Sequence, residues 1–426
     1  MKKVFPLFFA ATIASSSFAV YAQAGETKQV VGAGQTEGEM TKEKNSLEEV
    51  KELTLEDVIR RGTENSKNLT VLQLNLEIIK NQILKANYDK DKAAQEIKKL
   101  ENKIEDLKDE KERLSVASKR SINIEDRTKY RESIEALEDQ IKSLDTLIKK
   151  LEAGQLQLQF QEEEVKEGVR LMLTSSYTNI LLLQEQMGVT KKSLQSAINA
   201  VNKAQRLYDL GRVSKEAVRQ AQLARENVEK QLKDQEKSYG HTVADLSYEI
   251  GVAYNPNVIM KPIEFKATDF AQPTDISFLI EHSFKMKKAQ KDLESAILER
   301  DNVYKDYENG DAKVTIYDKA QQDYQVKIAE ESFASTKDHI ATAIKQLYQA
   351  GEDSYSSYEE AVRQLENKRK DLNGLTIRYK LGRVSKYDYE QAQLGLEQAE
   401  LKVFTAKVQN YTIQQSIAAL QRGYVQ

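Results

Sequence analysis

Residues that commonly carry out catalysis or bind metals are scarce in this chain. It has no Cys, which excludes disulfides, zinc–thiolate sites, iron–sulfur clusters and cysteine nucleophiles. Its three histidines, His241, His282 and His339, are widely separated along the chain, so no local two-histidine metal motif exists. No nucleophile–base set or phosphate-binding loop is present either. We therefore expect a protein without catalytic activity, metal or cofactor.

The clearest motif is one that occurs twice. The segment YDLGRVSK at 208–215 returns as YKLGRVSK at 379–386, and the same shift along the chain aligns QAQL at 220–223 with QAQL at 391–394. Eleven of the sixteen positions from 208 to 223 are identical in the second copy. This identity indicates an internal duplication.

Each copy has the residues of a tight connection between two helices. Gly211 and Gly382 are placed to end the incoming helix in a left-handed conformation. Ser214 and Ser385 are placed to cap the next helix, and Asp388 adds favourable negative charge near its start. Long stretches on both flanks contain no proline. We expect helices of about 40 to 60 residues, roughly 60–90 Å long at 1.5 Å per residue.

Composition supports a helical protein without a nucleic-acid partner. The chain of 426 residues has 4 Pro, where average usage would give about 20. Its 64 basic and 67 acidic residues leave a net charge of −3, so no basic footprint for nucleic acid is present. Three prolines, Pro256, Pro262 and Pro273, mark 254–274 as an extended connector, with a short strand expected near 258–265. The predicted fold is all-α, an elongated bundle of long helical hairpins in two internal repeats.

The N-terminus predicts export. Two lysines precede an apolar stretch at 4–14, and Ala22-Gln23-Ala24 provides a signal-peptidase site, with Val20-Tyr21-Ala22 as a competing one. A membrane anchor is the alternative, but the stretch is shorter than the roughly 20 residues that span a bilayer. The expected organisation is a signal peptide at 1–24, a flexible linker at 25–50, a first repeat at 51–253, the connector at 254–274 and a second repeat at 275–426.

A further hairpin is expected at 96–151 within the first repeat. Ile97, Leu100, Ile104, Leu107 and Leu114 fit the a and d positions of a heptad, with Lys111 in the seam. A second heptad set runs from Ile134 to Leu151. Residues 115–133 between them are polar and unpatterned, so we expect a helix, a loop and a helix that fold back as an antiparallel coiled coil. A coiled coil that binds a partner is the alternative.

These features together resemble the TolC-type outer-membrane efflux proteins. The resemblance rests on the LTLEDVIRRGTENS opening at 53–66, in which Thr54 is a helix-capping residue, and on a weaker second copy at 275–280. It also rests on the twofold repeat and the two Leu-Gly-x-x-Ser turns, each followed by Gln-Ala-Gln. Most of the chain after residue 53 is covered.

The resemblance implies a homotrimer whose twelve long helices form a hollow tunnel. Such proteins lack a catalytic site and serve as the exit duct of tripartite efflux or type I secretion systems, together with a periplasmic adaptor (membrane fusion) protein and an inner-membrane transporter. By motif match, the adaptor-docking turns here consist of Leu210, Gly211, Arg212, Val213, Ser214, Leu381, Gly382, Arg383, Val384 and Ser385. Asp388 matches an acidic position that narrows the tunnel entrance, and Gln391 stands where some members have a second acid.

One departure from the family concerns its membrane strands. A membrane strand needs about 9–11 residues of alternating polarity. The coiled coil at 96–151 occupies one expected place, and 308–328 alternates only briefly. We therefore expect little or no β-barrel. The exported protein then belongs to the outer membrane by resemblance, or is periplasmic or wall-associated.

A second class of function fits the same sequence. A structural coiled-coil protein of the cell envelope, without a pore, would also be long, helical and free of catalytic residues. In that case the two Leu-Gly-Arg-Val-Ser turns are simple helix connections, and Asp388 serves only to favour the start of its helix.

Overall fold

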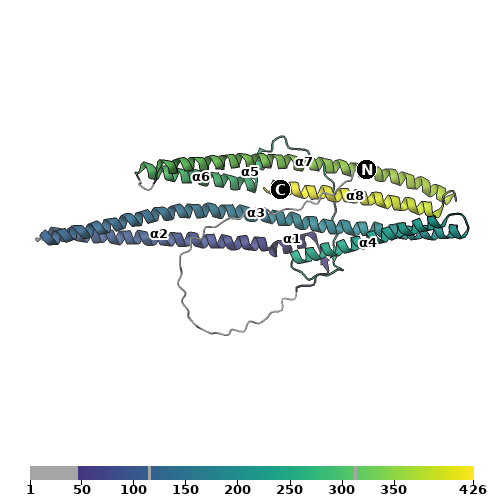
Figure 1. The fold of residues 1–426 in the computed structure, drawn as a ribbon, viewed down its shortest axis with the longest axis horizontal. Helices are drawn as coiled ribbons and strands as arrows, with labels where there is room; N and C mark the ends of the chain where they lie inside the picture. The colour runs from purple at the N-terminus through teal and green to yellow at the C-terminus, as the bar shows by residue number, and fades with distance from the viewer. Residues whose placement is uncertain (1–46, 114–116, 311–313) are drawn as a thin grey trace, which may run out of the picture. The chain divides into compact units, whose positions relative to one another are not determined.

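The computed structural model describes residues 47–113, 117–310 and 314–426, and their side chains outside 110–123. The predicted signal peptide and most of the predicted linker lie outside the described residues. The elements are β1 (Glu52–Leu53), α1 (Leu55–Glu64), α2 (Lys67–Arg113), α3 (Ala117–Asp209), α4 (Lys215–Glu249), β2 (Ile259–Met260), α5 (Ser277–His282), α6 (Phe284–Glu308), α7 (Ile316–Lys380) and α8 (Lys386–Gln421). The predicted all-α class is confirmed for these residues (Figure 1).

Helix α3 is the common partner of the other long helices. It has 93 residues, which corresponds to about 140 Å at 1.5 Å per residue. It packs against α2 along one half of its length and against α4 along the other, while α6 and α8 lie on a further side. Helices α6, α7 and α8 form the second set of hairpins (Figure 1). None of the described helices is both long and apolar enough to cross a membrane.

The helices are longer than expected, and one predicted loop is wrong. Residues 117–133 belong to α3, where a loop was expected at 115–133. This segment contains neither Pro nor Gly, so nothing in it prevents helix continuation. Glu125 pairs with Lys129 at 3.3 Å, one turn apart, and Lys103 of α2 lies over the Tyr130 ring. Helix α7, with 65 residues, likewise exceeds the expected length.

The predicted coiled-coil seam is confirmed. Leu100 and Ile104 of α2 and Ile148 of α3 are buried. The remaining a and d residues of both heptad sets with described side chains are half-buried. Residues 96–113 and 117–151 therefore form an antiparallel helical hairpin through an apolar seam.

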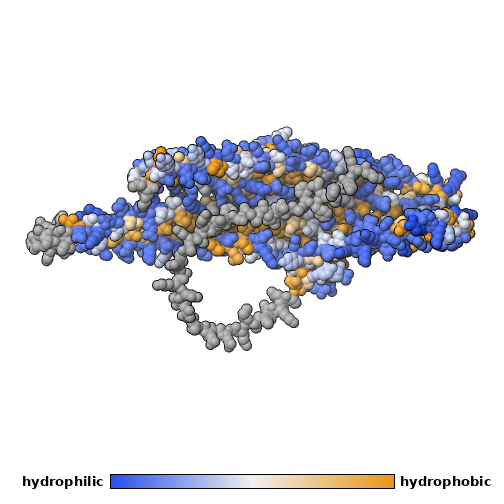
Figure 2. All heavy atoms as spheres, in the orientation of Figure 1, coloured by the Kyte–Doolittle hydropathy of each residue, from blue (hydrophilic) through white to orange (hydrophobic). Residues whose placement is uncertain are grey.

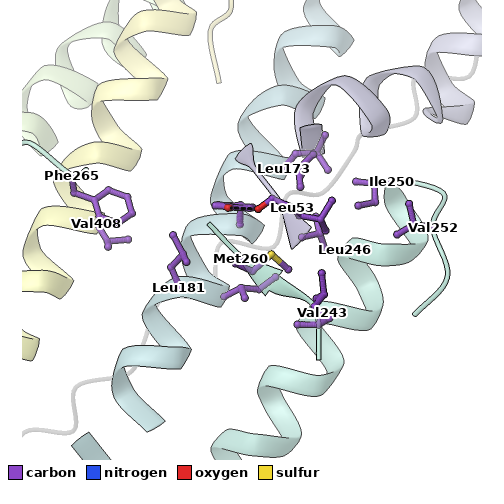
Figure 3. Packing of buried hydrophobic residues seen from close by; sticks show 14 residues of the cluster. Leu53, Leu173, Leu181, Val243, Leu246, Ile250, Val252, Met260, Phe265 and Val408 are labelled. Carbon is purple, nitrogen blue, oxygen red and sulfur yellow. Dashed lines mark hydrogen bonds between the residues drawn. The ribbon is translucent and has the colours of Figure 1, made fainter. Parts of the chain in front are cut away.

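The middle of α3 carries the apolar core around the two strands. Strands β1 and β2 pair in parallel, with Leu53 opposite Met260. The predicted strand at 258–265 is thus present but reduced to two residues. Figure 3 shows the surrounding buried side chains, which come from α3, α4, the connector and α8: Leu173, Leu181, Val243, Leu246, Ile250, Val252, Phe265 and Val408.

The Tyr177 hydroxyl holds both strands against α3. It lies 2.9 Å from the Leu53 carbonyl oxygen and 2.7 Å from the Lys261 carbonyl oxygen, and its side chain is fully buried. Burial raises the pKa of Tyr177 to about 12. Buried carbonyls require such partners, because an unsatisfied one costs the free energy of its desolvation. Tyr177 therefore links the connector and the N-terminal strand to the longest helix.

Buried residues of the first repeat recur in the second repeat at the same spacing along the chain as the two turn motifs. Leu173 and Tyr177 of α3 correspond to Ile344 and Tyr348 of α7, and all four are buried. The short helices α1 and α5 occur at the predicted opening motif and its weaker copy. Thr54 caps α1 as predicted, with its hydroxyl oxygen 3.1 Å from the Asp57 amide nitrogen. The boundaries of the two repeats remain a prediction.

A Tyr177→Phe substitution should lower the free energy of unfolding by about 1–3 kcal/mol, because it leaves the Lys261 carbonyl without the hydroxyl donor, while the Leu53 carbonyl keeps the Lys261 amide at 2.9 Å. Tyr348→Phe is the matched control, since Tyr348 is buried in α7 and makes no side-chain hydrogen bond within the described part of the chain. Urea unfolding followed by circular dichroism measures both. Equal destabilisation by the two substitutions would contradict the role given to the Tyr177 hydroxyl.

Tyr177 should also make stability sensitive to alkaline pH. The unfolded tyrosine ionises near pH 10, whereas folded Tyr177 keeps its proton to about pH 12. Its contribution is therefore complete below about pH 10 and is lost as the pH rises to about 12. The difference in unfolding free energy between the wild type and Tyr177→Phe should shrink over this range. A difference that stays constant would argue against the raised pKa.

Candidate docking turns at one end of the hairpins

The two repeated motifs form two nearly identical turns. Helix α3 ends at Asp209 and α4 begins at Lys215; α7 ends at Lys380 and α8 begins at Lys386. Gly211 has φ +68° and Gly382 has φ +69°, as the sequence predicts. These angles belong to the left-handed region, which glycine adopts without steric cost.

Each glycine closes its helix with the same pair of backbone hydrogen bonds. The Gly211 amide donates to the Tyr208 carbonyl at 2.8 Å, and the Arg212 amide donates to the Leu207 carbonyl at 2.8 Å. In the second turn the corresponding distances are 2.9 Å, from Gly382 to Tyr379 and from Arg383 to Arg378. This is the Schellman arrangement. It fixes the direction of the chain beyond each helix.

Two serines begin the outgoing helices. The Ser214 hydroxyl oxygen accepts from the Ala217 amide at 3.3 Å, and the Ser385 hydroxyl oxygen accepts from the Asp388 amide at 3.1 Å. Ser385 also donates to the Asp388 carboxylate at 2.7 Å. The first turn lacks this acid, but Glu216 stands beside Ala217 and pairs with Arg219 at 2.7 Å. That ion pair lowers the pKa of Glu216 and keeps negative charge near the helix start.

The turns expose apolar and cationic side chains side by side. Leu210 is 68% exposed and Leu381 is 63% exposed, the largest exposed apolar groups of the two turns. Arg212 and Arg383 are exposed next to them, while Val213 and Val384 are half-buried. Hydrophobic residues are visible at this end of a surface that is otherwise mostly hydrophilic (Figure 2).

Contacts between α3 and α8 bring the two turns to the same end (Figure 1). Lys192 pairs with Glu397 at 2.7 Å, and this hydrogen bond raises the pKa of Lys192. Lys203 lies over the Tyr387 ring, 4.2 Å from its centroid. Two further polar contacts join Ser196 to Gln391 and Asn199 to Glu390.

This polar seam was not predicted from the sequence. The contacting residues of α3 are at 192, 196, 199 and 203, an alternation of four-residue and three-residue steps that keeps them on one helix face. A search for polar heptads, beside the apolar ones, would have found it.

The two candidate gate residues lie in different environments. Asp388 is exposed in the first turn of α8 and bonds to Ser385. Gln391 donates to the Ser196 hydroxyl of α3 and so lies between the hairpins. The side chain of Asp388 is thus exposed to solvent, whereas that of Gln391 is half-buried. Within the described ranges no group of three or more His, Asp or Glu side chains could hold a metal ion.

This fold is similar to those of solved outer-membrane channels. The Campylobacter jejuni CmeC outer membrane channel matches with a TM-score of 0.58 and 13% identity, over 94% of this chain and 95% of that chain. A membrane protein from Pseudomonas aeruginosa matches with a TM-score of 0.57 and 12% identity, over 90% and 92%. The open state of the Neisseria gonorrhoeae MtrE outer membrane channel matches with a TM-score of 0.51 and 12% identity, over 87% and 89%.

The likeness to these channels establishes the TolC-type fold that the sequence predicts. No protein-family model and no curated protein sequence matches the chain. At these low identities the likeness describes the fold alone.

Alanine at Gly211 or Gly382 should lower the free energy of unfolding by about 1–2 kcal/mol each, because alanine resists the left-handed conformation. An added Cβ would contact nothing at either position, so the cost is conformational. Gly374→Ala in α7 is the matched control, because it is equally open but helical. It should stabilise by about 0.5–1 kcal/mol. Urea unfolding measures both changes in the free energy of unfolding, which should be negative for the two turn glycines and positive for Gly374→Ala. Stabilisation by Gly211→Ala would contradict the turn geometry.

Proposed function

We propose that this chain is the exit duct of a tripartite efflux or type I secretion system. In this proposal it is an exported, homotrimeric, TolC-like conduit of the cell envelope, and it passes solutes without chemical change. The observation that carries the proposal is the pair of LGRVS turns, held at the same end of a channel-type fold. A duplicated, exposed pentapeptide at one end of a long bundle is what a repeated docking surface requires.

The turns would dock on a periplasmic adaptor through their exposed leucines. Leu210 and Leu381 offer apolar contacts, and Arg212 and Arg383 beside them offer charged hydrogen bonds. Interfaces concentrate their affinity in apolar and arginine side chains of this kind. Rigid Schellman turns reduce the ordering cost of binding. Because each chain presents two turns, a trimer would bind its adaptors with avidity.

A trimer also completes the packing of the helices. Along the half of α3 that contacts α2 and α6, the helices lie in the order α2, α3, α6 and α7, so α2 and α7 form the two edges. Edges that differ from each other join head to tail, and such contacts close into rings when the rotation permits. Three copies would supply the twelve helices of a TolC-like tunnel.

Asp388 would narrow the entrance of this tunnel. It lies in the first turn of α8, next to the docking turn, and is exposed. Three copies would bring three such carboxylates to one level of the ring. Gln391 is the second candidate, although its bond to Ser196 ties it to the seam between hairpins.

A spacer or scaffold of the envelope without a pore is the alternative function. It is favoured by the coiled coil of α2 and α3 around residues 96–151, which buries apolar side chains in its own seam and has a mainly polar outer surface. The mass and the shape of the purified assembly distinguish the duct from the scaffold.

The purified chain should have the mass of a trimer in analytical ultracentrifugation. Averaged electron micrographs viewed down the long axis should show a ring with a hollow centre, because twelve helices placed side by side form a wall one helix thick. A solid rod, a monomer or a dimer would contradict the duct.

Leu210→Asp combined with Leu381→Asp should abolish transport, because charged side chains at the tips prevent apolar docking. The measurement is complementation of a deletion strain for resistance to a panel of amphipathic dyes and drugs. Ile124→Asp is the control, since Ile124 is 48% exposed near the opposite end of α3. Both variants should retain wild-type helix content. Full resistance in the tip variant would contradict docking through the turns.

A further inference from the structure

We infer that an apolar stripe on α2 packs into the groove between α6 and α7 of a neighbouring copy. This inference rests on the proposed trimer and identifies the surfaces that join its copies. The α2 stripe is defined by Val71, Leu74, Ile78, Leu84 and Tyr88, which are 55%, 59%, 52%, 66% and 67% exposed.

The α2 stripe lies opposite the face that α2 packs on α3. The buried residues of the same stretch, Leu69, Leu72, Leu76 and Ala86, form the other side of the helix. Single exposed apolar residues are normal on proteins, but the five of the α2 stripe follow one another along one side and form a patch. A helix that is apolar on two sides is typical of one packed on both. Figure 2 shows hydrophobic residues along the α2 hairpin within a mainly hydrophilic surface.

The second surface is a groove of about 520 Å³ between α6 and α7. Its floor includes small side chains, among them Ala289 and Ala296 of α6 and Ser332 of α7, together with the 62% exposed Ile328. Acid and amide side chains also line it, namely Asp292, Glu299, Gln321, Gln322 and Gln325. The groove is open to solvent, so side chains of another copy can enter it. The buried Oε1 of Gln322 has no hydrogen-bond partner within the described residues. A donor from another copy would satisfy this oxygen.

The axial level of the α2 stripe follows from two contacts between α2 and α3. Lys90 pairs with Asp145 at 2.5 Å, and Gln73 bonds Glu162 at 3.0 Å. The step from Gln73 to Lys90 on α2 equals the step from Asp145 to Glu162 on α3, so the antiparallel register is constant between these contacts. Leu84 therefore lies at the level of residue 151 of α3.

The groove lies at the same level. Lys150 of α3 pairs with Glu299 of α6 at 2.7 Å, and Tyr304 of α6 bonds Asp323 of α7 at 2.8 Å. Continuing that register along the hairpin places Ile328 opposite residue 299. Leu84 and Ile328 thus share one level on opposite edges of the chain. Copies related by rotation about an axis parallel to the helices keep their levels, so these residues meet across the ring.

The two edges are also complementary in charge. Residues 67–90 of α2 contain four lysines and two acids, whereas residues 316–338 of α7 contain five acids and three lysines. Opposite net charges favour this pairing over contact between two copies of the same edge.

Disulfide trapping tests the inference directly, because the chain has no cysteine of its own. Leu84→Cys combined with Ile328→Cys should form crosslinked dimers and trimers under mild oxidation. Within one copy α3 and α6 separate the two positions by roughly 25–30 Å, given interaxial distances of 8–10 Å. A disulfide needs Cα atoms closer than about 7 Å, so the bond must join two copies. The readout is a non-reducing gel, calibrated by mass.

The matched control combines Leu84→Cys with Tyr317→Cys. Tyr317 is 82% exposed on the same helix as Ile328 but lies about 17 Å away along the axis. It should crosslink at least tenfold less. A trimer in ultracentrifugation that forms no 84–328 bond, or equal crosslinking of both pairs, would overturn the inference while leaving the duct intact. A monomer would overturn the duct as well.

A groove-filling variant tests the same surface without oxidation. Ala296→Trp should raise the dissociation constant of the trimer at least tenfold, because the indole occupies the space that the α2 stripe needs. Ala136→Trp is the control, since Ala136 is exposed on α3 away from the groove. Unchanged association of Ala296→Trp, with wild-type helix content, would count against the inference.

Discussion

The continuity of α3 is the constraint on which the rest of the structure depends. A single helix of 93 residues provides the surface on which α1, α2, α4, α6 and α8 all pack. Its contacts with α2 centre on apolar heptads, to which Lys90 with Asp145 adds an ion pair. Toward the two ends of the bundle, its contacts with α6 and α8 include ion pairs and amide or hydroxyl bonds, such as Lys150 with Glu299 and Lys192 with Glu397. The helices of one hairpin are therefore held by burial, and the hairpins of different repeats are held at both ends by polar seams. Exposed ion pairs contribute only about 0–1 kcal/mol each.

The strongest connection between the repeats lies in the middle. Tyr177 joins both strands to α3, and Asn410 of α8 bonds the Thr268 amide at 2.8 Å and the Thr268 carbonyl at 3.1 Å. Both side chains are fully buried, so each bond replaces one that water would otherwise provide. The connector is consequently fixed at two points, one in each repeat. The bonds that keep the two repeats together are thus concentrated near the two strands. The polar seams mainly determine how the hairpins are aligned along their length.

Local features could be predicted from the sequence, and non-local ones could not. The left-handed glycines Gly211 and Gly382 and the serine caps depend only on a few neighbouring residues, so their types were sufficient. The loop expected at 115–133 was wrong because polarity was taken as a break, whereas only proline or glycine would have interrupted the helix. The bonds of Tyr177 and Asn410 join parts of the chain that are far apart in sequence. Nothing in the sequence around these residues marks them, because their partners are backbone groups that every residue has.

The unequal length of the repeats changes how the bundle can close on itself. Helix α6 ends at Glu308, and its last ion pair joins Asp306 to Lys142 of α3 at 2.6 Å. The hairpin of α2 and α3 continues past this level for about 20 residues of α2 and 25 residues of α3, roughly 30–38 Å. There Leu100 and Ile104 are buried in the seam between α2 and α3, so this part can bury most of its apolar side chains without a second layer. A ring of copies therefore has four helices per chain where α6 and α7 are present and two per chain beyond them, so contacts between copies must change at that level.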